Sequence, residues 1–156
     1  MTCYDEALQG SKCVDVFLQP TAGTIFATDT FVVNLVKERS FFSFHSFAMA
    51  RLIHQGKIVY TITDHYLNCN GTAWRNGQRK LSSQTYPNLR KLVVGRQVSR
   101  FLHKTWGDIV IEFDNGAVLE FIIDASPNRG HPEVHRLIIK KDIDSAAYPE
   151  HYVFER

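Results

Sequence analysis

The histidines and carboxylates are the side chains of this sequence with the most evident chemical potential. His131 and His135 flank Pro132, Glu133 and Val134. On a helix the two imidazoles would share a face and could ligate one metal ion, but a proline interrupts the segment and a strand-like run follows it. In an extended chain the rings would lie roughly 13 Å apart, at ~3.3 Å per residue, too far apart to share an ion. We therefore expect a solvated loop and no metal site here.

The three cysteines, Cys3, Cys13 and Cys69, show no catalytic or disulfide signature. Their odd number and their spacing match neither a disulfide framework nor a zinc knuckle. Cys69 ends an apolar run and is expected to be a small buried hydrophobe, and a reducing cytoplasm is the expected location. A nucleophile elbow, a phosphate-binding loop and a dinucleotide fingerprint are all absent from the sequence. The sequence thus predicts no cofactor and favours a non-catalytic protein, with a small hydrolase assembled only in three dimensions as an alternative.

The distribution of charge is the most informative feature of the sequence. The formal net charge is only +2, yet no Asp or Glu occurs between His65 and Trp106. All charged side chains in this stretch are basic, namely Arg75, Arg79, Lys80, Arg90, Lys91, Arg96, Arg100 and Lys104. A basic segment without local anions raises the encounter rate with a negatively charged surface.

Two interpretations of this basic segment are open. In the first, the cations of residues 96–104 only face Glu112 and Glu120 across a sheet, in pairs that each contribute a fraction of a kcal/mol. In the second, residues 75–104 engage a macromolecular partner with an acidic surface, a protein in the first place and nucleic acid as a related case. The predicted partner-binding residues are Trp74, Arg75, Arg79, Lys80, Tyr86, Arg90 and Lys91.

The elements that position these residues are predicted to be mainly strands. Aromatic residues make up 12% of the chain, and many lie among β-branched residues, as is typical of sheet. The clearest element is a hairpin, in which runs at 108–113 and 117–123 flank a tight turn at Asn115-Gly116. Further strands are predicted at 13–18, 31–36, 57–69, 96–103, 135–141 and 152–154, with a short helical turn at 87–91.

The principal helix is predicted over Ser40–His54. Phe41, Phe44 and Ala48 recur there at helical spacing, whereas the alternative is a strand at the start of the segment, with successive side chains on opposite faces. If the helix covers the sheet, Phe41, Phe44 and Phe47 line an aromatic pocket between helix and sheet. A small-molecule-binding domain is therefore a further functional alternative.

Two short similarities suggest an internal duplication. Gly10 and Gly95 each precede a run that leads through a turn, at 21–25 and at 105–109, towards a strand. A true duplication predicts two similar β units packed about a pseudo-symmetry axis, and the alternative is a chance match of turn residues.

We predict one α+β domain over residues 1–156, built from a curved, mainly antiparallel and possibly barrel-like sheet with one principal helix packed on it. Exposed sheet edges and faces predict a homodimer. No apolar stretch is long enough for a transmembrane helix, so no membrane association is expected. The pattern from Leu92 to Val98, followed by Asp108-Ile109 and Gly116, resembles a strand and hairpin signature of many small bacterial proteins, some of which accompany toxins as immunity proteins.

Overall fold

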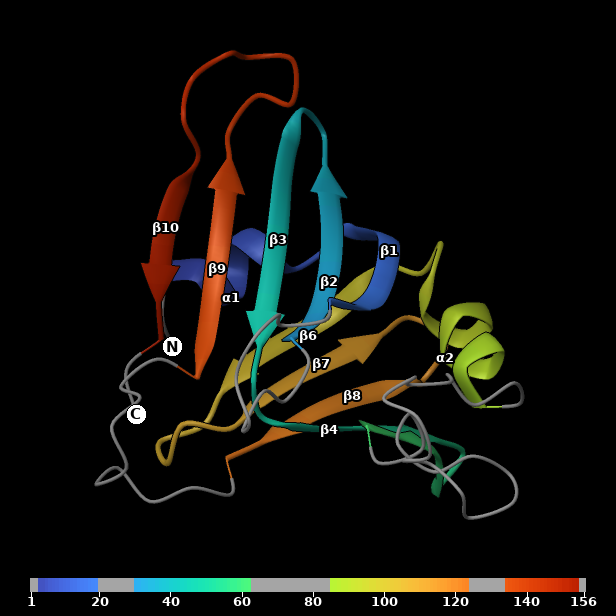
Figure 1. Cartoon of the computed structure of the whole chain (residues 1–156). Coiled ribbons are helices and arrows are strands. Elements are labelled where there is room, and N and C mark those ends of the chain that lie inside the picture. The colour runs from blue at the N-terminus through green and yellow to red at the C-terminus, as the bar shows by residue number, and fades with distance from the viewer. Residues whose placement is uncertain (1–2, 20–29, 63–84, 124–133, 155–156) are drawn as a thin grey trace, which may run out of the picture.

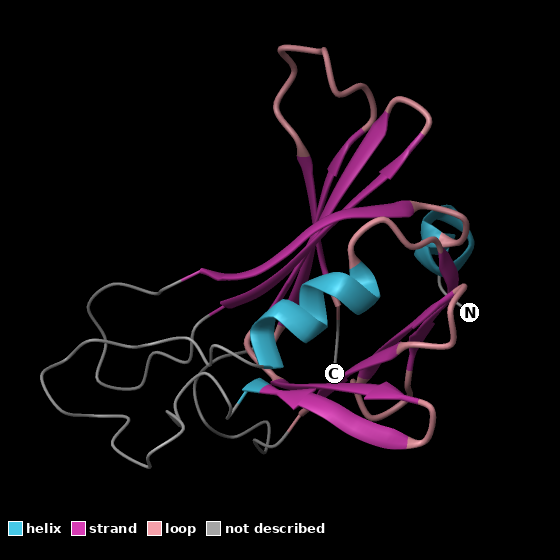
Figure 2. Ribbon diagram, turned by 90° about the vertical axis from the view of Figure 1, so that its right-hand side faces the viewer, coloured by secondary structure: helices cyan, strands magenta, loops and turns pink. Residues whose placement is uncertain are grey.

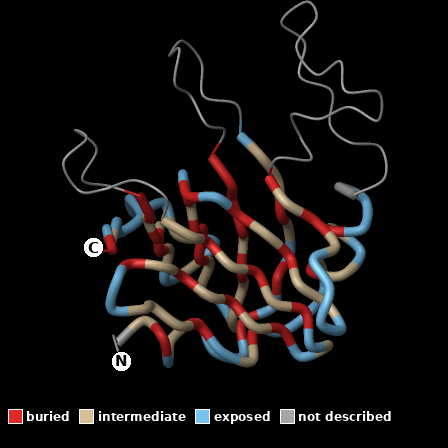
Figure 3. Tube along the Cα trace, turned by 90° about the horizontal axis from the view of Figure 1, so that it is seen from below, coloured by how far each residue is buried: buried red, intermediate tan, exposed pale blue. Residues whose placement is uncertain are grey.

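Several strands, β7, β8 and β9 most clearly, alternate between buried and partly buried positions, and the buried side chains face the space between the layers of the fold (Figure 3). The computed structural model describes residues 3–19, 30–62, 85–123 and 134–154. In chain order, the described elements are α1 (Cys3–Leu8), β1 (Lys12–Gln19), β2 (Thr30–Lys37), β3 (Ser40–Ser46), β4 (Met49–His54), β5 (Lys57–Thr61), α2 (Thr85–Val93), β6 (Val98–His103), β7 (Ile109–Phe113), β8 (Val118–Ile122), β9 (His135–Lys140) and β10 (Glu150–Val153).

The ten described strands form two five-stranded antiparallel sheets. Sheet A has the order β1-β2-β3-β9-β10, and sheet B has the order β5-β4-β8-β7-β6. The strands of the two sheets cross steeply (Figure 1), and α2 lies between the sheets at one open side (Figure 2). The prediction of a mainly antiparallel protein is confirmed. The barrel-like variant is wrong, because the two ladders do not close into one barrel: within the described residues, an isolated bridge between Lys12 and Gln97 links their edges.

The helix predicted over Ser40–His54 is wrong. The segment forms β3 and β4, which belong to different sheets. Phe42 and Phe44 enter the core while Phe41 stays partly exposed on the opposite face, as the two-residue period of a strand requires. The Ser46 hydroxyl accepts a hydrogen bond from the Ala48 amide at 3.0 Å where the chain turns from one sheet to the other. The alternative of a strand is therefore confirmed for this segment.

The other predicted elements are found with small shifts at their ends. The runs at 13–18, 31–36, 96–103, 135–141 and 152–154 form β1, β2, β6, β9 and β10, and 87–91 lies within α2. The strand predicted at 57–69 is β5 as far as Thr61, and residues 63–69 lie outside the described part. The predicted hairpin is β7 and β8, and Gly116 has a φ of 78° in its turn.

Aromatic side chains fill the space between the sheets. Phe44 is fully buried and makes edge-to-face contacts with Phe101, Phe121 and Phe154 at ring-centroid distances of 5.8, 5.0 and 6.1 Å. These four rings come from both sheets and from the residue that follows β10. Such contacts add to the hydrophobic gain of burial and hold the two layers together.

Of the two interpretations of the internal similarity, the order of the described elements favours duplication, although the motif at 21–25 lies outside the described residues. The series α1-β1-β2-β3-β4-β5 is repeated by α2-β6-β7-β8-β9-β10. In each half the first three strands form one side of a sheet, and the last two strands cross over to complete the sheet of the other half. Sheet A therefore contains three strands of the first half and two of the second, and sheet B has the reverse composition.

At the junction of the two halves, equivalent residues make equivalent hydrogen bonds, so the halves are related by a pseudo-twofold axis. Gly10 donates to Val98, and its counterpart Gly95 donates to Cys13, both at 2.7 Å. The symmetric bonds from Cys13 to Arg96 and from Val98 to Ser11 are both 2.8 Å long. Equivalent bulges follow Cys13 in β1 and Val98 in β6. The pseudo-axis thus passes through the Lys12–Gln97 bridge.

Candidate functional site

The structure describes only part of the predicted basic surface. Trp74, Arg75, Arg79 and Lys80 lie outside the described residues, and Tyr86, Arg90 and Lys91 belong to α2. One guanidinium nitrogen of Arg90 donates to a carboxylate oxygen of Asp15 at 2.5 Å and to the carbonyl of Val16 at 2.9 Å. Arg90 thus links α2 to β1 through these hydrogen bonds. Lys91 is exposed.

The charge pairs predicted across the sheet, between the cations of 96–104 and the carboxylates of Glu112 and Glu120, are found in part. Arg100 of β6 reaches Glu112 of β7 at 3.5 Å, as expected for cross-strand neighbours. Glu120 instead accepts a hydrogen bond at 2.5 Å from the Nε–H of Arg51 on the neighbouring strand β4. Position 51 lies in the segment for which a helix was predicted, so this pair was not visible from sequence.

The predicted aromatic pocket residues do not converge. Phe44 lies in the core, Phe41 lies on the opposite face of the same strand, and Phe47 is 40% exposed after the end of β3. Because β3 replaces the expected helix, no space between a helix and a sheet is left for these three rings to line.

The outer face of sheet B carries exposed apolar side chains. Trp106, Ile58 and Met49 have 66%, 55% and 44% of their surface exposed. Trp106 lies in the β6–β7 connection, Ile58 in β5 and Met49 in β4. We call this surface the sheet B face and define it by Met49, Arg51, Ile58, Arg100, Lys104, Trp106, Val110, Glu112, Glu120 and Ile122.

A hollow of about 150 Å³ lies on the sheet B face beside Trp106. Its polar walls come from Arg51, Lys104, Asp108 and Glu120. The indole Nε1–H of Trp106 donates to Asp108 Oδ2 at 2.7 Å, while Asp108 Oδ1 accepts from the amide of Ile123 at 2.8 Å. Asp108 thereby holds the edge of the indole ring, and most of the side chain remains available to a ligand.

The arginines of the sheet B face are more exposed than the carboxylates that pair with them. The side chain of Arg51 is 38% exposed against 24% for Glu120, and that of Arg100 is 59% exposed against 31% for Glu112. The guanidinium groups of these pairs are therefore more accessible to solvent than the carboxylates, although the formal charges of the pairs cancel.

His135 has no accessible surface for catalysis. It is 1% exposed, stacks on Phe44 at 5.7 Å, and places Nδ1 3.0 Å from Ser46 Oγ and Nε2 3.0 Å from the carbonyl of Gly107. The expectation of a solvated loop is thus wrong for this histidine, which links β9, β3 and the β6–β7 connection inside the core. His131 and Glu133 lie outside the described residues.

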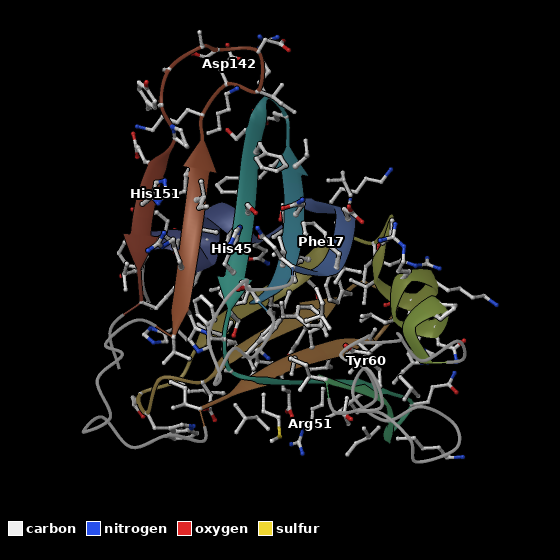
Figure 4. The ribbon with its side chains drawn as sticks, in the orientation of Figure 1. Phe17, His45, Arg51, Tyr60, Asp142 and His151 are labelled. Atoms are coloured by element: carbon white, nitrogen blue, oxygen red, sulfur yellow. The ribbon has the colours of Figure 1, made fainter. Side chains whose placement is uncertain are left out.

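A second serine–histidine contact lies on the outer face of sheet A. Ser43 Oγ donates to Asn34 Oδ1 at 2.6 Å and lies 2.8 Å from His45 Nε2. Figure 4 shows His45 on β3, with Phe17 and His151 on the strands to either side of the sheet, whereas Arg51 projects from sheet B. Ser43 is 7% exposed, so this group serves first to orient His45 and Asn34.

Comparison of the chain with protein-family models, with curated proteins and with solved structures finds no significant match. The resemblance to small bacterial proteins therefore rests only on the pattern of residues 92–98, 108–109 and 116. Among the described residues, no helix combines the length and apolar character needed to cross a membrane. Within the same residues, no three His, Cys, Asp or Glu side chains gather in a way that could hold a metal ion.

Reasoning from the sequence missed Trp106, Met49 and Arg51 as surface residues. A signal for Arg51 was present, because Arg51-Leu52-Ile53 recurs as Arg136-Leu137-Ile138 at the same offset that separates Gly10 from Gly95. The two triplets occupy equivalent positions in β4 and β9: Leu52 pairs with Leu119 of β8, and Leu137 pairs with Phe44 of β3. The repeated arginine is therefore an outward-facing position in both sheets.

Proposed function

We propose that this chain is a non-catalytic binding protein that engages an acidic protein surface. The observation that carries the proposal is the sheet B face, where Trp106 and Met49 are exposed beside arginines that are more exposed than their carboxylate partners. Tryptophan, arginine and methionine are enriched in the centres of protein interfaces, and tryptophan and arginine dominate their binding energy. Of the basic segment 75–104, Arg100 and Lys104 belong to this face.

The expected binding mode has an apolar centre and a basic rim. Trp106 and Met49 would lose their exposed surface on contact, at about 25 cal/mol for each Å² of apolar area. The cations Arg51, Arg100 and Lys104 would speed association and orient acidic groups of the partner, an effect that salt weakens. The affinity would therefore depend on the apolar residues at all salt concentrations and on the cations mainly at low salt.

A quantitative capture experiment from a host lysate tests this proposal. The chain is immobilised and washed at low salt and at about 0.5 M salt, with and without nuclease, and retained proteins are identified by mass. We expect an acidic protein that nuclease does not remove and that high salt weakens. Trp106→Ala should lower its affinity about tenfold or more, as truncation of an interface hot spot does.

Tyr148→Ala provides the matched control, because Tyr148 is an aromatic residue with 98% exposure that lies in the β9–β10 connection, away from the sheet B face. This variant should retain the partner as strongly as the wild type. Equal retention by the Trp106→Ala and wild-type chains would refute the proposed surface. Light scattering of the free chain tests the predicted homodimer, and dissociation of a dimer by Trp106→Ala would show that a second copy, rather than an acidic partner, covers this face.

A further inference from the structure

The hollow on the sheet B face combines an apolar wall with separate polar groups. Ile109 and Phe121, both fully buried, contribute to its lining together with Val110 and Ile122, which are partly exposed. Trp106, with 66% of its surface exposed, adds the face of an indole ring. The volume of about 150 Å³ matches a cavity that takes one benzene-sized molecule. The hollow therefore has room for a single side chain of a partner.

The turn that carries Lys104 and Trp106 is held in place by its own backbone and by the core. The amide of Lys104 donates to the carbonyl of Asp108 at 2.8 Å, and the amide of Gly107 donates to the carbonyl of Lys104 at 2.9 Å. From the core, His135 Nε2 lies 3.0 Å from the carbonyl of Gly107. The hydrogen bond from Trp106 to Asp108 fixes the ring itself. A partner therefore meets a wall that is already formed, which lowers the entropic cost of binding.

The carboxylates of the hollow already accept hydrogen bonds. Asp108 accepts one at each of its carboxylate oxygens, and Glu120 accepts the Nε–H of Arg51 through Oε2. The two cations of the lining, Arg51 and Lys104, balance the two carboxylates in formal charge. A charged guest would therefore lose its hydration without a net attraction in return. The acidic groups of the proposed partner would lie around the hollow, and the group inside it would be neutral.

A donor and an acceptor in the hollow are without partners in the described part of the chain. There, the ammonium of Lys104 forms no hydrogen bond or ion pair, and Glu120 Oε1 accepts no hydrogen bond. Both groups line the same hollow as the exposed indole. A hydroxyl can accept from an ammonium and donate to a carboxylate through one oxygen atom. An aromatic hydroxyl adds a ring that can stack on the indole.

We propose that the hollow receives a tyrosine side chain of the protein partner. This inference rests on the proposed function, because it names the residue that anchors the partner on the sheet B face. The ring of the tyrosine packs against the indole of Trp106, and its hydroxyl accepts from Lys104 and donates to Glu120. Tyrosine is among the residues that dominate the binding energy of protein interfaces, and such residues fill well-packed pockets.

Selection of random twelve-residue peptides displayed on phage tests this inference on the full chain. Peptides are selected on the immobilised wild-type chain and depleted on Trp106→Ala, so that only peptides that need the indole are kept. The retained peptides should share one tyrosine. Replacement of that tyrosine by phenylalanine should weaken binding about tenfold, as loss of a hydrogen bond to a charged group does.

Lys104→Met tests the hydrogen bond directly, because methionine keeps much of the apolar stem and removes the ammonium. This variant should reduce the preference for the tyrosine peptide over its phenylalanine version severalfold. Lys141→Met is the matched control, since it removes the same charge from a residue that follows β9 of the other sheet and pairs with Glu150. The control should keep the full preference, and the melting temperatures of both variants confirm that they fold.

Four results would overturn the tyrosine anchor: equal binding of the tyrosine and phenylalanine peptides, an acidic residue at the shared position, equal effects of the two lysine variants, or a selection that yields no peptide dependent on Trp106. The lysate capture separates these results from failure of the proposed function. An acidic protein that wild type retains and Trp106→Ala loses would leave the sheet B face as an interface with a different anchor. Equal capture by Trp106→Ala and wild type would remove both proposals.

Discussion

Substitution of Gly116 by valine tests how the β7–β8 hairpin is built. The φ of Gly116 is 78°, and its amide donates to the carbonyl of Phe113 at 2.9 Å. The amide of Phe113 in turn donates to Ala117 at 2.9 Å, so the loop has three residues and its last one is left-handed. The sequence predicts a tight turn at Asn115-Gly116, and the left-handed residue of that turn is the glycine.

The expected loss of stability follows from the backbone alone. A Cβ built on Gly116 would meet no atom outside its chain neighbours within 4 Å, so the loss is expected to come from the backbone conformation. The left-handed conformation costs an L-residue about 1–2 kcal/mol, and a β-branched residue somewhat more. In a chain of this size, each kcal/mol lowers the melting temperature by about 2–4 °C.

Thermal and urea denaturation of the wild type and of Gly116→Val measure this loss. Gly116→Asn is the control, because asparagine tolerates the left-handed region better than other L-residues and should lose less stability. A valine variant as stable as the wild type, or an asparagine variant less stable than the valine one, would refute the reasoning from φ.

Three further predictions concern the core and a second turn. Burial raises the pKa of Cys13 to about 12, so this thiol should resist alkylation at pH 8 in the folded chain, as peptide mass analysis would show. Its contribution to stability should be lost as the pH rises from about 9 towards 12, because the unfolded chain releases the proton first, and Cys13→Val should remove that part of the pH dependence. Phe44→Ala should cost about 3–5 kcal/mol in urea denaturation, whereas Phe41→Ala on the outer face of the same strand should cost far less. Glu38 has a φ of 55° in the β2–β3 turn, so Glu38→Gly should raise the melting temperature by a few degrees, on the order of 1 kcal/mol of relieved strain.

The strands were predictable from sequence because most of them are short alternating runs bounded by turns. The segment from Ser40 to His54 was not, because Phe41, Phe44 and Ala48 also fit helical spacing. What decides its structure is tertiary: β2 and β9 pair with β3 on both sides, and β8 and β5 pair with β4. A single sequence window contains no information about partners so distant along the chain.

The sheet B face could be predicted only in part. The basic character of 96–104 and the pairing of Arg100 with Glu112 follow from strand alternation. The contact between Arg51 and Glu120 exists because β4 crosses into the other sheet. The duplication predicts this crossing only after the repeated Arg-Leu-Ile triplet has been recognised. The exposure of Trp106 depends on the hydrogen bond with Asp108, within a turn whose geometry the sequence does not specify.

The exchange of strands between the two halves constrains how the chain acquires its structure during synthesis. When β5 has left the ribosome, β4 still lacks its neighbour β8, and β3 still lacks β9. At that stage three strands of sheet A and two strands of sheet B have unpaired edges, and they stay unpaired until the second half has been synthesised. Closing such long loops is slow, and open edges invite pairing with the wrong chain. If two nascent chains on one message exchange halves, the product is a domain-swapped dimer, and we expect this to be the main misfolded form of the architecture.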